Sequence, residues 1–173
     1  ESSGEEREAI ENLLLHKSPR DWRDVEALAL LGTDAARDAL INALYDADPQ
    51  MRMAVVRHAP DLVSVQERTE SLVRAIRSAA PFEGLSQILD EAEEFHPPKV
   101  IDALMRGAYE GDPEAAVHFA ALLLFLHGQA EEAFDWAHRP FFLRFNTEDA
   151  AERKTAFLEL CARIGVDPKT VTG

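Results

Sequence analysis

Histidine is the side chain best suited to bind a metal or move a proton near neutral pH, so the six histidines are the first candidates for chemistry. They are His16, His58, His96, His118, His127 and His138. No two have the four-residue spacing that lets imidazoles on one helix face share a zinc ion. His118 and His127 stand nine residues apart on one predicted helix, about 13 Å along its axis. We therefore predict no metal site, and interpret His118 as a buried histidine with one hydrogen-bond partner; a ligand or general base is the alternative.

Four carboxylates form the densest charged cluster of the sequence: Asp90, Glu91, Glu93 and Glu94. Carboxylates held close together and shielded from water raise each other's pKa, which is how general acid and base pairs arise. This cluster lies near the end of a predicted helix beside "HPP", where side chains face water. We interpret it as solvated surface or as a docking patch for a basic partner, with acid–base catalysis as the third alternative.

Linear motifs of common catalytic sites are absent. The sequence has no glycine-rich dinucleotide or phosphate-binding loop and no Gly-x-Ser-x-Gly elbow. Cys161 is the only cysteine and lies on the apolar face of a predicted helix, far in sequence from the nearest histidine. We expect no catalytic residue, no cofactor and no enzymatic activity.

The charge balance indicates which partners the chain can attract. It has 32 acidic and 18 basic side chains, a formal charge of −14. Such a field repels phosphate backbones and favours basic proteins, so we expect a basic protein partner rather than nucleic acid.

Length and composition predict a single soluble domain over residues 1–173, with 1–6 flexible. The longest apolar run, 119–126, is much shorter than the roughly 20 residues that span a bilayer, so we expect no membrane segment. One unpaired thiol is compatible with a reducing compartment, and we expect the cytoplasm.

Four prolines recur at a near-constant spacing and predict where helices begin. They are Pro19, Pro49, Pro81 and Pro113, separated by 30, 32 and 32 residues. Proline suits the first position of a helix, and the residues before three of them, Ser18, Asp48 and Asp112, can cap a helix N-terminus. A unit of this size accommodates two short helices and two turns, so we predict helical repeats over 19–127.

The segments between the prolines have helical periodicity and recognisable ends. Gly32 and Gly128 suit helix C-termini, and Ser64 with Glu67 forms a predicted capping box. We expect helices over residues 19–31, from 33 or 34 through 44, and over 50–59, 67–79, 82–95, 99–110, 114–126 and 147–165. Since sustained two-residue alternation is absent, the predicted class is all-α.

The stretch "ALALLGTDAARDALINALYDADPQMRMAVVRHA", residues 27–59, resembles HEAT repeats: an Ala/Leu helix, a Leu-Gly turn, a second helix, an Asp-x-Asp-Pro turn and a helix with arginines. Residues 100–126 repeat the Asp-Pro turn without those arginines. The resemblance implies a short right-handed α-solenoid of HEAT-like helix pairs, with Asp48, Arg52 and Arg57 in a structural polar ladder. HEAT-like DNA glycosylases and chromophore lyases are the enzymatic alternatives, although the net charge opposes DNA binding.

The C-terminal part departs from the repeat. After an aromatic loop over 128–146, "NTED" predicts a helix capped by Asn146 or Thr147, with Phe157, Leu160, Cys161 and Ile164 buried and Gly165 at its end. A short acidic solenoid with this ending resembles small bacterial immunity proteins. The resemblance implies a module that binds and neutralises a cognate toxin, such as a basic nuclease; a general assembly adaptor is the alternative.

The stretch "FDWAHRPFFLRF", residues 134–145, has five of the thirteen aromatic residues of the chain. Repeat arrays need an atypical element to cover the last apolar face. We predict that Phe134, Phe141, Phe142 and Phe145 form the core of this cap, with Pro140 breaking the helix between them. Trp136, Arg139 and Arg144 are predicted to stay partly exposed for a partner, because Trp and Arg are enriched at the energetic centres of interfaces.

Overall fold

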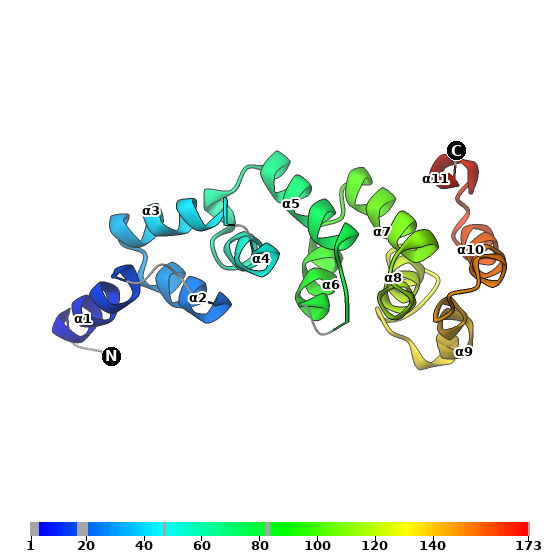
Figure 1. Ribbon diagram of the computed structural model, residues 1–173, viewed down its shortest axis with the longest axis horizontal. Helices are drawn as coiled ribbons and strands as arrows, with labels where there is room; N and C mark the ends of the chain where they lie inside the picture. The colour runs from blue at the N-terminus through cyan, green and yellow to red at the C-terminus, as the bar shows by residue number, and fades with distance from the viewer. Residues whose placement is uncertain (1–3, 17–20, 47, 82–83, 173) are drawn as a thin grey trace. The chain divides into compact units, whose positions relative to one another are not determined.

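A computed structural model describes residues 4–16, 21–46, 48–81 and 84–172. These residues form α-helices, short 3₁₀ helices and the turns between them, without a strand (Figure 1). The predicted all-α class is confirmed. Within the same ranges, no helix is both long and apolar enough to cross a membrane.

The chain divides into two compact units, Glu1–Ser71 and Leu72–Gly173, where the sequence suggested one domain. The first unit packs α2 against α3 and α4, and α1 against α2 and α3. Helix α5 begins in the first unit and ends in the second. The elements up to α5 are α1 (Gly4–Leu15), α2 (Trp22–Leu31), α3 (Asp34–Ala43), α4 (Pro49–His58), η1 (Pro60–Leu62) and α5 (Val65–Arg77).

The second unit is built around α8, which contacts α6, α7, α9, η3 and α10. Helix α8 is apolar on every side, as expected of a helix surrounded by others, and its buried residues run from Ala115 to Leu124 with His118 as the interruption. The elements of this unit are α6 (Leu85–Glu94), α7 (Pro98–Glu110), α8 (Pro113–Leu126), η2 (Trp136–His138), α9 (Arg139–Phe142), η3 (Leu143–Phe145), α10 (Ala150–Ile164) and α11 (Lys169–Thr172).

Two of the four periodic prolines begin helices as predicted. Pro49 opens α4, where the Asp48 carboxylate accepts from the Gln50 N–H at 2.8 Å. Pro113 opens α8, where Asp112 accepts from the N–H groups of Glu114 and Ala115 at 2.9 and 3.1 Å. These turns are equivalent in chemistry, since each carboxylate satisfies N–H groups that have no partner within the helix.

The other two prolines give a different outcome. Pro81 lies in a turn, and α6 begins only at Leu85 after Gly84, whose φ is 81°. The prediction that Pro81 begins a helix is therefore wrong. Pro19 and Ser18 lie outside the described residues, as does the beginning of the first predicted repeat.

Several predicted helix ends are confirmed. Gly32 ends α2 and Gly165 ends α10, both in the left-handed conformation that glycine adopts without steric cost. Ser64 and Glu67 form the predicted capping box, in which the Ser64 N–H donates to Glu67 and the Glu67 N–H donates back to the Ser64 hydroxyl, at 3.0 and 3.2 Å.

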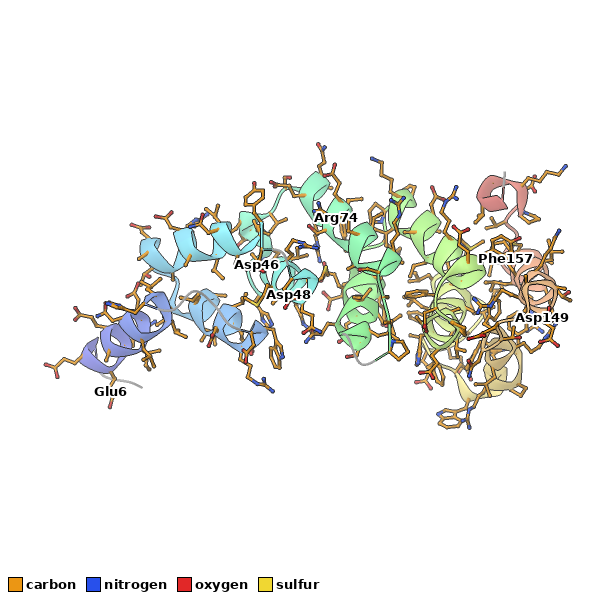
Figure 2. All side chains as sticks on the ribbon, in the orientation of Figure 1. Glu6, Asp46, Asp48, Arg74, Asp149 and Phe157 are labelled. Atoms are coloured by element: carbon orange, nitrogen blue, oxygen red, sulfur yellow. The ribbon has the colours of Figure 1, made fainter. Side chains whose placement is uncertain are left out.

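Two expectations about helices need correction. Helices α1 and α11 were not anticipated. The cap of α10 is Asp149, not Asn146 or Thr147; its carboxylate accepts from the N–H groups of Ala151 and Glu152 (Figure 2). Thr147 instead accepts from the Asp149 N–H at 3.1 Å and positions this turn.

The predicted polar ladder in the first unit remains a prediction. Asp48 caps its own helix, and Arg52 donates to the backbone carbonyl of Asp46, in the turn where Asp46 and Asp48 are labelled in Figure 2. Arg57 is exposed on the last turn of α4. The contacts of Asp48 and Arg52 stabilise the turn between α3 and α4.

Candidate functional site

The aromatic segment after α8 separates into an inward and an outward side. Phe141, Phe142 and Phe145 are buried, and α9 and η3 pack them onto α8. Phe134 is half-buried; its ring lies 4.5 Å from that of Phe142 and 5.1 Å from that of His118, centroid to centroid. The predicted burial is confirmed for Phe141, Phe142 and Phe145, whereas Phe134 is only half-buried.

Pro140 has a different role from the one predicted. It lies in the first turn of α9, where its missing N–H removes no helical hydrogen bond. Before it, Asp135 caps η2 by accepting from the Ala137 N–H at 2.8 Å. Pro140 therefore lies in the first turn of α9, the short helix whose Phe141 and Phe142 are buried, and it does not interrupt a helix.

Trp136 and Arg139 form the most prominent exposed group of this segment. Trp136 is 65% exposed, and the Arg139 guanidinium carbon lies 4.5 Å from the centre of its ring. A guanidinium at this distance over an indole is attracted by the ring quadrupole and restricts the orientation of both side chains. Leu143, one turn after Arg139, is also exposed. We call Trp136, Arg139 and Leu143 the cap surface.

Arg144 belongs to a neighbouring ion-pair network. Its guanidinium lies 2.5 Å from the Glu159 carboxylate, which also accepts from Arg163 at 2.6 Å. Hydrogen bonds from Arg144, and then from Arg163, lower the pKa of Glu159. Both guanidinium groups also lie over the ring of Phe141. Arg144 is thus exposed as predicted, but it already has partners within the chain.

The four clustered carboxylates of α6 do not share one environment. Asp90, Glu93 and Glu94 are exposed, whereas Glu91 is 3% exposed and lies on the buried side of the helix with Ile88 and Ala92. The expectation that the cluster points into water as one patch is therefore wrong at Glu91. Helical spacing explains the difference, since Ile88, Glu91 and Ala92 are three and four residues apart.

His118 interrupts α8 but differs from the predicted buried histidine with a hydrogen-bond partner. It is half-buried, stacks on Phe134, and makes no hydrogen bond within the described part of the chain. Burial lowers its pKa, and the nearby Glu114 carboxylate opposes that shift. The stack attaches the segment after α8 back onto the middle of the helix.

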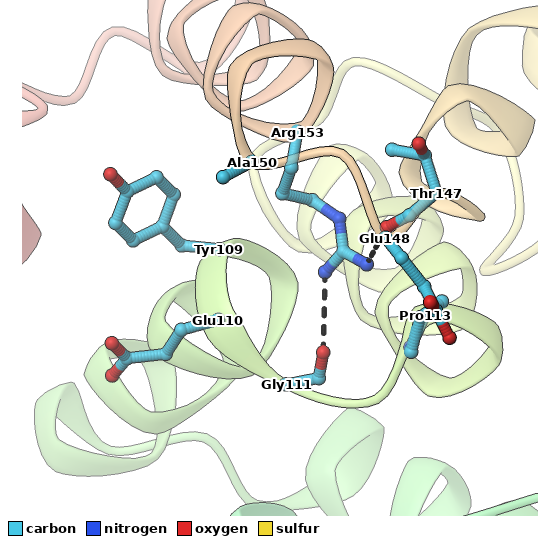
Figure 3. A pocket seen from close by; sticks show the side chains of 8 residues that line it. All are labelled: Tyr109, Glu110, Gly111, Pro113, Thr147, Glu148, Ala150 and Arg153. Carbon is cyan, nitrogen blue, oxygen red and sulfur yellow. Dashed lines mark hydrogen bonds between the residues drawn. The ribbon is translucent and has the colours of Figure 1, made fainter.

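A cavity of about 420 Å³ lies where α7, the turn after it and the start of α10 meet. Arg153 of α10 reaches into this region and donates to the backbone carbonyls of Gly111 at 3.3 Å and Thr147 at 2.8 Å (Figure 3). It also donates to the backbone carbonyl of Ala108 at 3.3 Å. The carbonyls of Ala108 and Gly111 belong to the C-terminal end of α7, where the helix dipole stabilises a positive charge. The residues lining the cavity are Tyr109, Glu110, Gly111, Pro113, Thr147, Glu148, Ala150 and Arg153.

Arg153 is 6% exposed, and its Nε atom is buried without a hydrogen-bond partner among the described residues. Burial lowers the pKa of the guanidinium, and the Asp112 carboxylate opposes the shift. The side chain joins α10 to the end of α7, and the contact between Tyr109 and Phe157, with ring centroids 4.8 Å apart, joins the same helices. Phe157 is labelled on α10 in Figure 2. The Arg153 side chain therefore has the geometry of a structural clamp between α10 and α7.

Sequence reasoning missed Arg153, although a signal was present. Arg153 precedes Phe157 by four residues and therefore lies on the same helix face as Phe157, Leu160 and Cys161. A charged residue on an otherwise buried face needs polar partners within the fold. The sequence alone does not identify the backbone carbonyls that are these polar partners, because their position depends on how α7 packs.

The remaining candidates for chemistry have structural surroundings. Cys161 is buried on α10 as predicted, and burial raises the pKa of its thiol, which disfavours the nucleophilic thiolate. In the part of the chain that the structure describes, no three His, Cys, Asp or Glu side chains are grouped so that they could hold a metal ion.

Comparison of the chain with protein families, with curated proteins and with solved structures gives no significant match.

Proposed function

We propose that this protein is a protein-binding module made of HEAT-like helix pairs in a right-handed solenoid, and most specifically an immunity protein that neutralises a cognate toxin. The observation that carries the proposal is the cap surface, where Arg139 stacks on an indole that is 65% exposed. A tryptophan side chain has few rotatable bonds and therefore loses little entropy on binding, and Trp and Arg dominate the energetics of interfaces.

The distribution of charge supports a basic partner. Each unit has seven more acidic than basic side chains, with 15 against 8 in residues 1–71 and 17 against 10 in residues 72–173. On α6 the exposed acids are Asp90, Glu93 and Glu94. Both α6 and the cap pack on α8, so the acids and the cap surface belong to one unit. The acidic field would accelerate the approach of a basic toxin, while Trp136 and Arg139 would anchor it.

The repeat interpretation is supported by chemistry shared between the units. Helices α4 and α8 begin in the same way, with an aspartate cap followed by proline. The pairs α2 with α3 and α7 with α8 are each in contact and joined by short turns. Stacked pairs of this kind present an extended surface to a partner.

The test is direct binding to the protein encoded beside this one, with a toxicity assay in cells. Wild-type protein should bind a basic neighbour and restore growth, and higher salt should slow association because it screens the acidic field. Trp136→Ala should weaken binding by about 30-fold or more, equivalent to about 2 kcal/mol. Its free energy of unfolding should change by no more than about 0.5 kcal/mol, because the side chain is exposed.

Tyr45→Ala is the matched control, because Tyr45 is an aromatic residue that is 75% exposed in the first unit. It should bind the partner like the wild type. Equal losses for Tyr45→Ala and Trp136→Ala would rule out the cap surface as the anchor. A neighbour that binds but is not toxic would replace the immunity role with that of an adaptor.

A further inference from the structure

A second cavity, of about 400 Å³, lies within the second unit and shares the lining residues Glu110 and Gly111 with the cavity at Arg153. Two buried side chains, Ile76 and Phe119, belong to its lining. Gly107 lets α7 approach α8 here, because a Cβ at this position would lie 2.7 Å from the Phe119 ring. The residues lining the cavity are Ile76, Arg77, Ala79, Arg106, Gly107, Glu110, Gly111, Asp112 and Phe119.

Two arginines from different helices line this cavity, Arg77 at the end of α5 and Arg106 on α7. Neither makes an ion pair with any described residue. For Arg106 this is notable, because Asp102 precedes it by four residues, the order that favours a helical ion pair. The side chain instead lines the cavity.

The acidic residues of the cavity do not balance the two arginines. The Asp112 carboxylate already accepts two N–H groups at the start of α8, which compensates its charge. Glu110 is exposed and is the remaining carboxylate. Arg77 and Arg106, which are both exposed, therefore line the cavity together with one uncompensated carboxylate. The chain that follows Arg77, from Ser78 to His138, has twelve acidic residues and two basic ones, Lys99 and Arg106.

We infer that this cavity is a binding site for a small anion, with Arg77 and Arg106 holding a carboxylate or phosphate group of the ligand. A guanidinium offers a planar pair of donors that matches either group, and hydrogen bonds between opposite charges are the strong ones. The apolar part of such a ligand would lie toward Phe119 and Ile76. This site does not depend on the proposed toxin partner, since none of its lining residues belongs to the cap surface.

Titration of the full chain followed by NMR tests the site. The probes are inorganic phosphate, phenyl phosphate and benzoate, at ionic strength matched with sodium chloride. At least one should shift the amide signals of Gly107 and Gly111 in a saturable manner. A response to both phosphates assigns a phosphate group, and a response to benzoate alone assigns a carboxylate.

Variants distinguish the cavity from general attraction to positive charge. Arg77→Gln and Arg106→Gln should each weaken binding by about tenfold or more, as expected for the loss of charged hydrogen bonds. Lys99→Gln is the matched control, because Lys99 is exposed on the same helix as Arg106 and does not line the cavity. Absence of saturation with all three probes would overturn the inference, as would equal losses for Lys99→Gln and Arg106→Gln. The spectra also report whether each variant is folded.

Discussion

The two units are both helical and have the same net charge, but they fill their interiors differently. All nine phenylalanines of the chain lie in residues 72–173, and none lies in residues 1–71. Phe119, Phe142, Phe145 and Phe157 are among the largest fully buried side chains. The first unit buries aliphatic side chains instead, such as Val25, Leu28, Leu40 and Val55.

The first helix of the first unit and the last long helix of the second unit show the same contrast. Helix α1 buries no residue and leaves Ile10 and Leu13 exposed. Helix α10 buries Phe157, Leu160 and Cys161 and is joined to α7 through Arg153. Because stability follows buried apolar area and contact density, the second unit should open less readily than the first. A rigid unit is also the better support for an exposed aromatic side chain such as Trp136.

The largest expected effect comes from removing part of the aromatic core. Phe145→Ala should lower the free energy of unfolding by about 3–5 kcal/mol, because it leaves a cavity among buried rings. Hydrogen exchange measured by mass spectrometry should show the change in peptides of residues 72–173. Leu143→Ala, on the same short helix but exposed, should have a much smaller effect. Equal acceleration of exchange in both units would mean that they unfold as one.

The next largest effect is expected from replacing Arg153, which joins α10 to α7 in the second unit. Arg153→Met should destabilise it by about 2–3 kcal/mol, because the buried carbonyl of Ala108 and the partly buried carbonyls of Gly111 and Thr147 lose a charged donor. Urea denaturation gives the free energy, and exchange should accelerate at residues 107–112. Lys154→Met changes an exposed neighbour and should have little effect. A similar loss for both variants would contradict the clamp.

The helix caps at Asp48 and Asp112 allow the two units to be compared at equivalent positions. Asp48→Ala and Asp112→Ala should each cost about 1 kcal/mol, because each carboxylate satisfies N–H groups at the start of a helix. Exchange should accelerate at the first turn of α4 in one variant and of α8 in the other. Asp102→Ala, in the middle of α7 and exposed, is the control and should be nearly neutral. If neither variant changed the free energy of unfolding, proline alone would determine where these two helices begin.

The smallest expected effect is a pH dependence specific to the second unit. Burial holds the pKa of His118 below its ordinary value of 6.5, so the unfolded chain binds a proton here at a higher pH than the folded chain does. The free energy of unfolding should therefore decrease as pH falls through this range, and level off below the folded-state pKa. His118→Gln should flatten this part of the profile measured by urea denaturation, whereas His96→Gln, at an exposed site, should not. Identical profiles for all three proteins would contradict the assignment.

Local signals in the sequence predicted much of the secondary structure. The Asp-Pro turns at Asp48 and Asp112, the capping box at Ser64 and the glycine at the end of α10 all depend on neighbouring residues alone, and the structure has them as predicted. Pro81 failed because a proline can also occupy a turn, and only the surrounding chain decides which. The division into two units could not be predicted, since no linker composition marks it.

What the sequence determined by itself was helical class, overall charge and the inward direction of the cap phenylalanines, because periodicity and composition fix these locally. Only the tertiary structure decided that Arg153 clamps the end of α7 and that Arg77 and Arg106 line one cavity. Those facts join residues of different helices. They depend on how helices cross and where side chains find room, which no single helix specifies.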